Sequence, residues 1–283
     1  MTAFSEDTVW FVTGSSSGLG HEIASMALAR GWRVVLAARQ PEALASLANQ
    51  YPETAMTVRL DVTEPASVAA AVKAAQARFG QIDVLVNAAG YGYLAAIEEG
   101  EDDAIRAQFE TNVFGLLALT RAVLPGMRAR RSGHIVNFSS LGGLVAFAAT
   151  GYYHATKFAV EALSESLAHE VKPLGIAVTI VEPGAFRTEW AGRSMIASQT
   201  IIDDYAETAG KRRAATKSVS GHQPGDPVKG AAAVIAALES DVPPLRLLLG
   251  KSALDVALKR LDALRTNFEA WRDLTEGTDF PAA

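Results

Sequence analysis

The 283-residue sequence contains no cysteine. Without a thiol, the chain can form no disulfide, thiolate zinc site, iron–sulfur cluster or cysteine nucleophile. Its five histidines are scattered, and no two of them have the His-x-x-x-His spacing that places two imidazoles on one helix face around a metal. We therefore expect no metal in the functional site.

The sequence also lacks a strong excess of either charge, since it contains 31 acidic and 26 basic side chains and its net charge is −5. A nucleic-acid partner would require a basic footprint, so none is expected. No run of about 18 apolar residues could span a bilayer. The N-terminus has neither the basic start nor the apolar core of a signal peptide. These absences favour a cytoplasmic protein without a membrane partner.

Short apolar runs that are typical of strands alternate with segments of helical periodicity. The predicted strands cover residues 8–13, 32–38, 56–60, 84–86, 134–138, 176–181 and 245–249. The longer predicted helices cover residues 102–130, 152–171 and 228–239. Such alternation indicates βαβ units and a parallel sheet with both faces covered. We expect an α/β fold with a single Rossmann-type, doubly wound parallel sheet of about seven strands and helices on both faces.

The alternation stops after Pro183, where roughly forty residues follow without a clean strand, which is long for a connection inside a compact domain. We expect a dinucleotide-binding and catalytic domain over residues 1–250, in which residues 184–226 form an excursion that covers the substrate. Residues 251–283 are rich in helix formers with apolar residues at near-helical spacing. They predict a C-terminal helical extension that packs on the same domain or on a partner subunit.

A glycine-rich turn, Thr13-Gly14-Ser15-Ser16-Ser17-Gly18-Leu19-Gly20, lies between the first predicted strand and the first helix. Glycines in such a turn let backbone N–H groups approach a pyrophosphate, and the helix N-terminus favours the anion. A tight turn without a ligand is the alternative, but the place after the first strand favours a nucleotide site. The expected cofactor contacts in this turn are Gly14, Ser16, Ser17, Gly18, Leu19 and Gly20.

The same turn matches the Gly-x-Ser-x-Gly nucleophile elbow of hydrolases. That interpretation would make Ser16 a nucleophile, with Asp203 and His222 as its partners. An α/β-hydrolase has several strands before its elbow, whereas only one predicted strand precedes this turn. A serine hydrolase is therefore the disfavoured alternative.

Five further motifs follow the turn in order: Asn87-Ala88-Ala89-Gly90, Thr111-Asn112-Val113-Phe114-Gly115, Asn137-Phe138-Ser139-Ser140, Tyr153-His154-Ala155-Thr156-Lys157 and Pro183-Gly184. In these motifs, over about residues 8–250, the sequence resembles the short-chain dehydrogenase/reductase family, in particular its NADP-dependent carbonyl reductases and hydroxysteroid dehydrogenases. The resemblance implies an oxidoreductase that interconverts a ketone or aldehyde and an alcohol by hydride transfer. A non-catalytic NADP(H)-binding redox sensor with the same fold is the alternative.

Tyr153 and Lys157 stand four residues apart on a predicted helix, so their side chains share one face. A phenol titrates near about 10, and an ammonium within about 4–6 Å lowers that pKa toward the range where general acid–base catalysis is effective. We therefore predict that Tyr153 is the general acid/base and that Lys157 lowers its pKa. A tyrosine and a lysine that merely pack together are the alternative.

Ser140 stands thirteen residues before Tyr153, the spacing that the family uses for its catalytic serine. Its hydroxyl would bond the reacting carbonyl oxygen. Ser139, as the neighbouring strand residue, would point to the opposite face, so we favour Ser140. The resemblance also implies that Asn112 supports a water that relays protons to Lys157. The alternative for Asn112 is a helix-interior residue that bonds the backbone.

NAD enzymes of this fold carry an acidic residue at the end of the second strand, where it binds the ribose 2′-hydroxyl. Here Ala38 takes that place and Arg39 follows it. A guanidinium binds phosphate as a bidentate fork, so Arg39 favours NADP(H) over NAD(H), with a surface arginine as the alternative. The resemblance adds further cofactor-binding residues: Asp61, Val62, Asn87, Ala88, Gly90, Tyr153, Lys157, Pro183, Gly184 and Thr188.

Large apolar side chains from the excursion and from earlier loops form the expected substrate wall: Tyr93, Leu144, Phe147, Trp190, Met195 and Ile196. They favour a bulky or hydrophobic small-molecule carbonyl or alcohol, although such residues are equally typical of ordinary core cover. We interpret the basic run at 211–213, together with Lys217, as a solvated helix face in preference to the alternative of an anion site. The resemblance implies a homodimer or homotetramer formed through the helices at 102–130 and 152–171.

Overall fold

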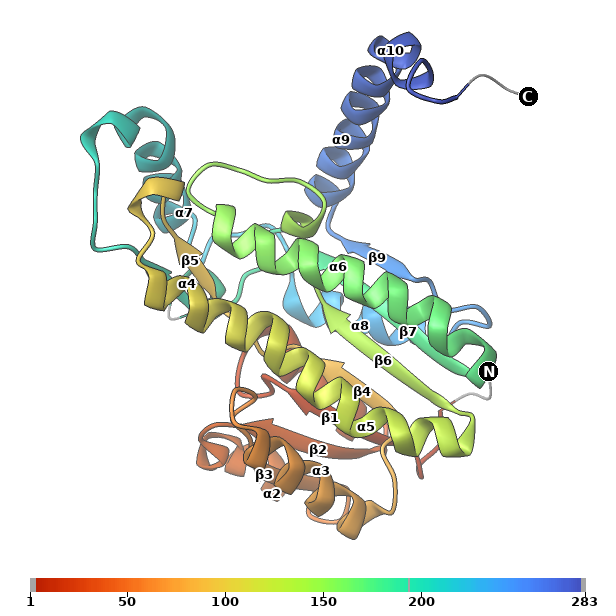
Figure 1. Ribbon diagram of the computed structural model, residues 1–283. Helices are drawn as coiled ribbons and strands as arrows, with labels where there is room; N and C mark the ends of the chain where they lie inside the picture. The colour runs from red at the N-terminus through yellow and green to blue at the C-terminus, as the bar shows by residue number, and fades with distance from the viewer. Residues whose placement is uncertain (1–3, 193, 281–283) are drawn as a thin grey trace.

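The computed structural model describes residues 4–192 and 194–280, and Figure 1 shows a central sheet between two helix layers. The seven strands are all parallel, in the order β3-β2-β1-β4-β6-β7-β9. They are β1 (Val9–Thr13), β2 (Arg33–Ala38), β3 (Ala55–Arg59), β4 (Val84–Asn87), β6 (Gly133–Phe138), β7 (Ile176–Pro183) and β9 (Arg246–Leu249). The predicted doubly wound parallel sheet is confirmed, and its strand order reverses between β1 and β4.

Helices cover both faces of this sheet: α1 (Gly18–Ala29), α2 (Ala45–Gln50) and α8 (Pro227–Leu238) on one side, and α3 (Pro65–Phe79), α5 (Leu116–Arg130) and α6 (Gly151–Val171) on the other. The strand β1 shows how the sequence supplies both layers. Trp10 and Val12 belong to the core cluster under α1 and α8, whereas Val9 and Phe11 belong to the opposite cluster. Because neither face of the strand meets solvent, the apolar run is continuous rather than alternating.

The tract predicted as one helix over residues 102–130 has three parts. The helices α4 (Asp102–Phe109) and α5 are joined by a π-helical segment, Glu110–Gly115. A π turn is wider than an α turn and is frequent at functional sites. This segment contains Asn112, and it passes so close to the loop after β3 that a Cβ on Gly115 would lie 2.6 Å from the side chain of Val62.

The excursion after β7 carries more structure than the sequence predicted. The strand β8 (Met195–Ala197) pairs in parallel with β5 (Gly92–Leu94) in a small second sheet, and α7 (Lys211–Ser218) follows. The expectation that no strand lies between 184 and 226 was therefore wrong. Each of these strands is three residues long, which is too short for a period-two pattern to stand out.

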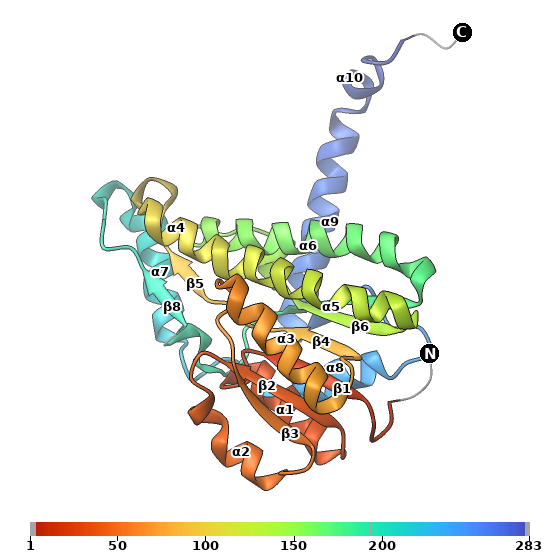
Figure 2. The same cartoon turned by 60° about the horizontal axis from the view of Figure 1, so that its bottom comes forward.

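The C-terminal residues form α9 (Lys251–Ala270) and α10 (Arg272–Glu276), and both views of the ribbon show this extension projecting from the domain (Figures 1 and 2). Ala253 and Ala257 in its first turns are buried. The larger apolar side chains are exposed: Leu254, Leu258, Leu261, Phe268, Trp271 and Leu274. The expectation that the extension packs on the same domain is therefore wrong beyond Ala257. Residues 281–283 lie outside the described part.

Within residues 4–192 and 194–280, no helix combines the length and the apolar character that a membrane span requires. The longest helix, α6, has 21 residues, but it carries charged side chains along its length, including Lys157, Glu161 and Glu165. The lack of a span is therefore a property of the composition of the long helices rather than of their length.

Candidate active site

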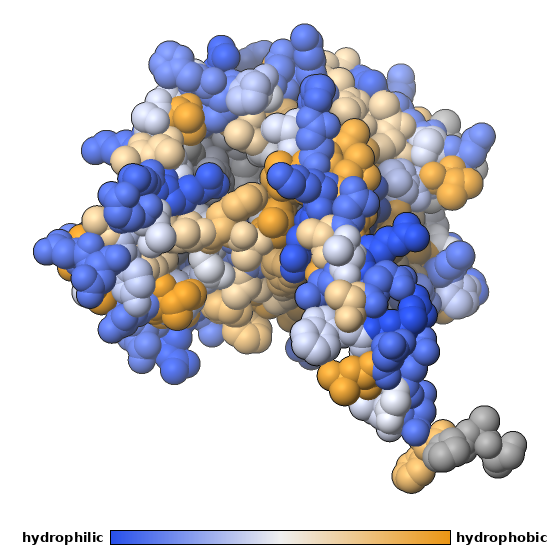
Figure 3. Space-filling model, turned by 90° about the horizontal axis from the view of Figure 1, so that it is seen from above, coloured by the Kyte–Doolittle hydropathy of each residue, from blue (hydrophilic) through white to orange (hydrophobic). Residues whose placement is uncertain are grey.

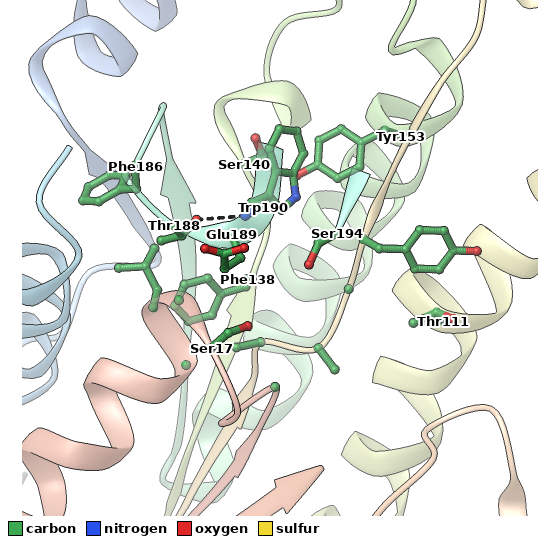
Figure 4. A pocket seen from close by; sticks show the side chains of 18 of the residues that line it. Ser17, Thr111, Phe138, Ser140, Tyr153, Phe186, Thr188, Glu189, Trp190 and Ser194 are labelled. Atoms are coloured by element: carbon green, nitrogen blue, oxygen red, sulfur yellow. Dashed lines mark hydrogen bonds between the residues drawn. The ribbon is translucent and has the colours of Figure 1, made fainter. Parts of the chain in front are cut away.

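A cavity of about 1100 Å³ opens at the carboxyl ends of the strands. Residues that end or follow β1, β4, β6 and β7 line it, so it lies where the strand order reverses. Open α/β sheets bind their ligands at this place. The glycine turn, the ends of the strands and the excursion all contribute to its wall, part of which Figure 4 shows. One continuous space therefore joins the predicted cofactor residues and the predicted catalytic residues.

The glycine turn forms one wall of this cavity. Gly14 has a φ of +64° and Gly18 one of +61°, a backbone region that favours glycine. A Cβ on Gly14 would also lie 2.9 Å from the carbonyl oxygen of Ala88. The helix α1 begins at Gly18, and no side chain of the described residues caps it at Ser17. Its first N–H groups are therefore available to an anion.

The cavity ends at the tips of β2 and β3. Ala38, Arg39, Asp61 and Val62 line it there. The Asp61 carboxylate accepts hydrogen bonds from the hydroxyl and the backbone N–H of Thr63, at 2.7 and 3.0 Å. These bonds, with a further contribution from the charge of Arg39, hold the pKa of Asp61 below its ordinary value. This end therefore offers one fixed carboxylate and one exposed guanidinium.

Tyr153 and Lys157 lie one turn apart on α6. The Nζ of Lys157 lies 5.7 Å from the centroid of the Tyr153 ring and donates to the carbonyl oxygen of Phe138 at 2.7 Å. Tyr153 lines the cavity, whereas the buried Lys157 lies behind the cavity wall. The spacing of four residues has brought the two side chains together, with the ammonium bonded to the end of β6.

Burial dominates the ionisation of both groups. It raises the pKa of Tyr153 to about 12, although a hydrogen bond with Ser140 acts in the opposite direction. Burial also lowers the pKa of Lys157 to about 8, against the effect of the Glu161 carboxylate. Burial outweighs the predicted lowering of the Tyr153 pKa by Lys157 in this geometry, and that effect of Lys157 stays a prediction. Removal from water disfavours both charged forms, so Tyr153 keeps its proton at neutral pH.

The two neighbouring serines differ in position. Ser140 lines the cavity near Tyr153, and its Oγ accepts a hydrogen bond from the N–H of Gly142 at 3.0 Å (Figure 4). Ser139 is buried outside the lining, and its Oγ donates to the carbonyl oxygen of Lys157 at 3.5 Å. The end of β6 therefore presents one hydroxyl to the cavity, and the catalytic role of Ser140 stays a prediction.

Two predicted asparagines and Pro183 lie outside the cavity lining. Asn112 Oδ1 accepts from the N–H of Tyr91 at 3.0 Å, and its Nδ2 donates to Thr156 Oγ1 at 3.1 Å. Asn112 thus ties the segment after β4 to α6, and its support of a proton-relaying water stays a prediction. Asn87 Nδ2 donates to Asn137 Oδ1 at 2.9 Å in a buried link between β4 and β6, so its side chain is structural.

Three of the six residues expected in the substrate wall line the cavity, and their contact with a substrate stays a prediction. Phe147, Trp190 and Ile196 line the cavity, and the ring centroid of Trp190 lies 5.2 Å from that of Tyr153 (Figure 4). Leu144 lies outside the lining. Tyr93 and Met195 were wrong because β5 and β8 turn them elsewhere. The hydroxyl of Tyr93 bonds Glu101, and the sulfur of Met195 packs on Gly92.

Two residues that the sequence did not assign to the site also line the cavity. His154 is buried, and its Nδ1 accepts from the N–H of Phe147 at 3.1 Å. Burial, and then the charge of Arg212, lower the pKa of His154 to about 4. In the basic run interpreted as a solvated helix face, the interpretation was wrong for Arg213, which pairs with the buried Glu99. Arg212 on α7 is exposed, as interpreted, and it also lines the cavity, with its Cζ 4.9 Å from the centroid of the Phe147 ring. No spacing rule in the sequence could have placed either residue here.

An acidic pair lies behind Lys157. Arg246 Nε lies 3.2 Å from Glu161 Oε2 and 3.5 Å from Glu182 Oε1. Burial, followed by the neighbouring Glu161 carboxylate, raises the pKa of Glu182 to about 8. Like charges at close range disfavour double ionisation, so Glu182 holds a proton at neutral pH while Arg246 balances Glu161.

The hydrolase alternative does not fit this geometry. Ser16 lines the cavity, but Asp203 and His222 are exposed on the excursion and are not part of that lining. In the described chain a single strand, β1, precedes the turn. As for metals, no group of three potential ligands among histidine and carboxylate side chains gathers anywhere in the described residues.

Comparisons with known proteins agree with this architecture. Residues 8–197 match the family model described as short chain dehydrogenase. The oxidoreductase BOA17 of Botryotinia fuckeliana is 42% identical over 268 residues, which cover 94% of this chain and 97% of that relative.

Solved structures give the same result. A short-chain dehydrogenase from Streptomyces avermitilis has a TM-score of 0.91 at 46% identity, covering 96% of this chain and 99% of that one. A short-chain dehydrogenase/reductase from Burkholderia phymatum in complex with NAD has a TM-score of 0.82 at 25% identity, covering 94% and 97%. A metagenomic short-chain oxidoreductase in complex with NADP has a TM-score of 0.68 at 27% identity, covering 87% and 98%. The neighbours therefore hold either nucleotide.

Proposed function

This chain belongs to the short-chain dehydrogenase/reductase family of oxidoreductases, and from that premise we propose that it interconverts a ketone or aldehyde and an alcohol with NADP(H). One observation carries the proposal. The hydroxyl-bearing side chains of Tyr153 and Ser140 both line the wall of a cavity that continues to the glycine turn. A carbonyl oxygen placed against this pair would meet two hydroxyl groups while the rest of the cavity holds the nucleotide.

The residues at the turn fit a dinucleotide. The uncapped start of α1 offers N–H groups to an anion, and a Cβ on Gly90 would lie 3.1 Å from Asn112 Oδ1. Glycine at this position keeps the floor of the cavity open, while Gly14 allows the close approach of the turn to Ala88. When bound, the nicotinamide cofactor would supply or accept the hydride.

Side chains of the protein would donate the proton to the carbonyl oxygen and orient the substrate. In the reducing direction, the protonated Tyr153 hydroxyl donates to the developing alkoxide, and Ser140 donates a second hydrogen bond to the same oxygen. The buried ammonium of Lys157, one turn behind, favours the tyrosinate that remains after donation. Trp190 and Phe147 keep the reacting carbon apart from bulk water.

The choice of NADP(H) over NAD(H) is supported by the tip of β2. Ala38 removes the carboxylate that would bond a ribose 2′-hydroxyl, and the exposed Arg39 offers a fork of donors to a 2′-phosphate. Asp61, on the neighbouring strand, is fixed by Thr63 and so does not reach Arg39 by any hydrogen bond of the described residues.

Exposed apolar side chains support a homo-oligomer as part of the same proposal. Phe114, Phe158 and Leu163 are exposed on the two long helical tracts, as the family resemblance requires. Phe158 and Leu163 lie on α6, and Phe114 lies in the π-helical segment. A second copy that covers these residues would remove their apolar side chains from water.

A second apolar stripe follows α9, along which Figure 3 shows hydrophobic side chains. Residues 251–265 carry four basic and two acidic side chains, whereas residues 266–279 carry one basic and four acidic ones. Two copies of α9 in antiparallel array would place unlike charges opposite each other around the stripe. The apolar stripe and the charge distribution of the extension therefore both favour its pairing with the same extension of a second copy.

Cofactor oxidation across a panel of ketones and aldehydes tests the proposal. We expect turnover with NADPH on at least one bulky carbonyl compound. If the purified protein binds NADPH but turns over no member of the panel, the redox-sensor alternative replaces the enzyme. The intact set of Ser140, Tyr153 and Lys157 favours the enzyme.

A further inference from the structure

We propose that Arg212 forms an anion subsite at the substrate end of the cavity, so that the preferred substrate is a ketone with a carboxylate several bonds from its carbonyl. This inference rests on the proposed carbonyl chemistry at Tyr153 and adds the class of substrate. It replaces the purely hydrophobic ketone that the apolar wall alone would suggest.

The three adjacent basic residues at the start of α7 have different surroundings. Lys211 Nζ lies 2.5 Å from Glu207 Oε2, and both side chains are exposed. Arg213 pairs with the Glu99 carboxylate, which is buried. Arg212 stands between them in the sequence and alone lines the cavity. Since successive residues on a helix point about 100° apart, the buried pair fixes which side of α7 faces the substrate.

The Arg212 guanidinium is held in place without losing its donors. Its Cζ lies 4.9 Å from the centroid of the Phe147 ring. An arginine over an aromatic face is stabilised by the ring, while its N–H groups lie in the guanidinium plane and stay available for a bidentate carboxylate. Within the described residues, no carboxylate forms an ion pair with Arg212.

The charges around the cavity place a positive group at each end. Arg39 and Arg212 are the two arginines of the described lining, one at the tip of β2 and the other on α7. Figure 1 shows α7 at the upper left of the view and β2 low in its centre. The neighbouring His154 is neutral at physiological pH, because its pKa is lowered to about 4. Three carboxylates also line the cavity: Asp61 after β3, Glu110 in the π-helical segment and Glu189 on the excursion.

The arrangement of rings indicates where the anion would lie relative to the carbonyl. Ring centroids are 5.8 Å apart between Tyr153 and His154, and 5.5 Å apart between His154 and Phe147. Arg212 lies over Phe147, at the far end of this series of ring contacts from Tyr153. A carboxylate attached directly to the reacting carbonyl would not reach both. An apolar spacer would instead pack along Phe147, Trp190 and Ile196.

The test compares isomeric oxo acids and their esters on the NADPH-loaded protein. The probes are 7-oxooctanoate, in which a chain separates the carboxylate from the ketone, 2-oxooctanoate, in which they are adjacent, and the methyl ester of each. We expect kcat/KM for 7-oxooctanoate to exceed that for its ester on the order of 10- to 100-fold, mainly through KM, because charged hydrogen bonds have that strength. We expect no such advantage for 2-oxooctanoate.

Variants assign the effect to one residue. Arg212→Gln is expected to lower kcat/KM for 7-oxooctanoate far more than for its ester, so that the ratio of acid to ester approaches one. Lys211→Gln, a neighbouring substitution outside the cavity, is expected to change neither substrate. Arg212→Lys keeps the charge but loses the fork, so it should retain part of the preference. Equal losses on acid and ester in Arg212→Gln, or no preference in the unmodified protein, would overturn the subsite.

A binding measurement separates this proposal from the proposed function. Octanoate and methyl octanoate contain no ketone, so calorimetric titration with them requires no turnover. If no carbonyl compound reacts but octanoate binds more tightly than its ester, and Arg212→Gln abolishes that difference, the subsite stands and the carbonyl chemistry fails. If octanoate binds the unmodified protein and Arg212→Gln equally, the subsite is wrong whatever the enzyme does with ketones.

Discussion

The ammonium of Lys157 lies 5.7 Å from the centre of the Tyr153 ring and donates its hydrogen bond to the end of β6. The pair shares a helix face, but no hydrogen bond in the described residues joins the ammonium to the Tyr153 hydroxyl. Because Tyr153 keeps its proton well above neutral pH, its ground state is an acid, which suits the reduction of a carbonyl. The lysine acts on the charged form that follows donation.

Tyr153→Phe should lower kcat for carbonyl reduction on the order of 10²- to 10⁴-fold, the usual contribution of one positioned acid. NADPH affinity should change little, because only the hydroxyl is removed. Tyr152→Phe is the matched control, since its hydroxyl donates to the carbonyl oxygen of Ile97 at 2.5 Å and does not line the cavity. Stopped-flow turnover together with nucleotide titration checks both. Full activity in Tyr153→Phe would refute the mechanism.

Ser140→Ala should lower kcat by about tenfold or more, because it removes a hydrogen bond to the oxygen that becomes charged. Ser139→Ala should leave kcat close to that of the unmodified protein, since the Ser139 hydroxyl bonds the backbone of Lys157. Steady-state kinetics of the two variants side by side decide between them. A larger loss in Ser139→Ala than in Ser140→Ala would reverse the assignment.

Arg39→Ala should raise KM for NADPH on the order of 10- to 100-fold, with little change for NADH, because it removes donors to a 2′-phosphate. Arg33→Ala is the control on the same strand, since Arg33 pairs with Asp7 at 2.7 Å away from the cavity. The ratio of kcat/KM for the two nucleotides is the measurement. If the unmodified protein prefers NADH, the proposed cofactor is wrong.

Glu99 should make the stability of the protein depend on pH in acid. Its bonds to Arg213 and to the N–H groups of Ile202 and Ala96 lower its pKa from 4.5 to about 2. Because the folded-state pKa lies below the unfolded one, the stabilisation is complete above about pH 4.5 and is lost as the pH falls through about 2. Urea unfolding at several pH values should show this loss.

Glu99→Gln should lower the free energy of unfolding at neutral pH by about 3 kcal/mol, since it leaves a buried arginine without its partner. Its unfolding should also vary less with pH in the acid window. Glu207→Gln breaks only the exposed pair with Lys211 and should cost at most about 1 kcal/mol. A Glu99→Gln protein with unchanged stability would show that the pair contributes nothing to holding α7.

The exposed stripe of α9 predicts an oligomer that depends on it. Light scattering should give the unmodified protein at least twice the chain mass of 29.9 kDa. The double change Leu258→Asp and Leu261→Asp should shift the mass toward the monomer at the same concentration. Val242→Asp, at an exposed position on a loop, serves as the control. An unmodified protein that is monomeric throughout would contradict the prediction.

The main architecture could be predicted because its causes are local. Each buried strand can be recognised from its continuous run of apolar residues. The glycine turn and the helix starts can be recognised because each depends on the backbone conformation of only a few neighbouring residues. The positions of Tyr153 and Lys157 relative to each other follow from helical spacing alone. These properties do not depend on contacts between residues far apart in the chain, so they can be predicted from the sequence.

The incorrect predictions concern residues whose orientation or burial depends on contacts with distant parts of the chain. Tyr93 is turned away from the cavity by β8, which lies about a hundred residues further along the chain. The ionisation of Tyr153 depends on how deeply the assembled site is buried, and spacing to Lys157 says nothing of that depth. Arg212 lines the cavity because Arg213 pairs with Glu99 across the fold. A basic run looks the same in sequence whichever member is turned inward.

The π-helical segment at Glu110–Gly115 has a consequence for how this gene can vary in length. Deleting one residue there would let the tract revert to a uniform α-helix and would rotate α4 by about 100° against α5. Asn112 could then no longer keep both of its hydrogen bonds, the one to the N–H of Tyr91 and the one to the hydroxyl of Thr156. Insertions and deletions should therefore be excluded from this tract across natural sequences, while the surface loop near Val242 should accept them.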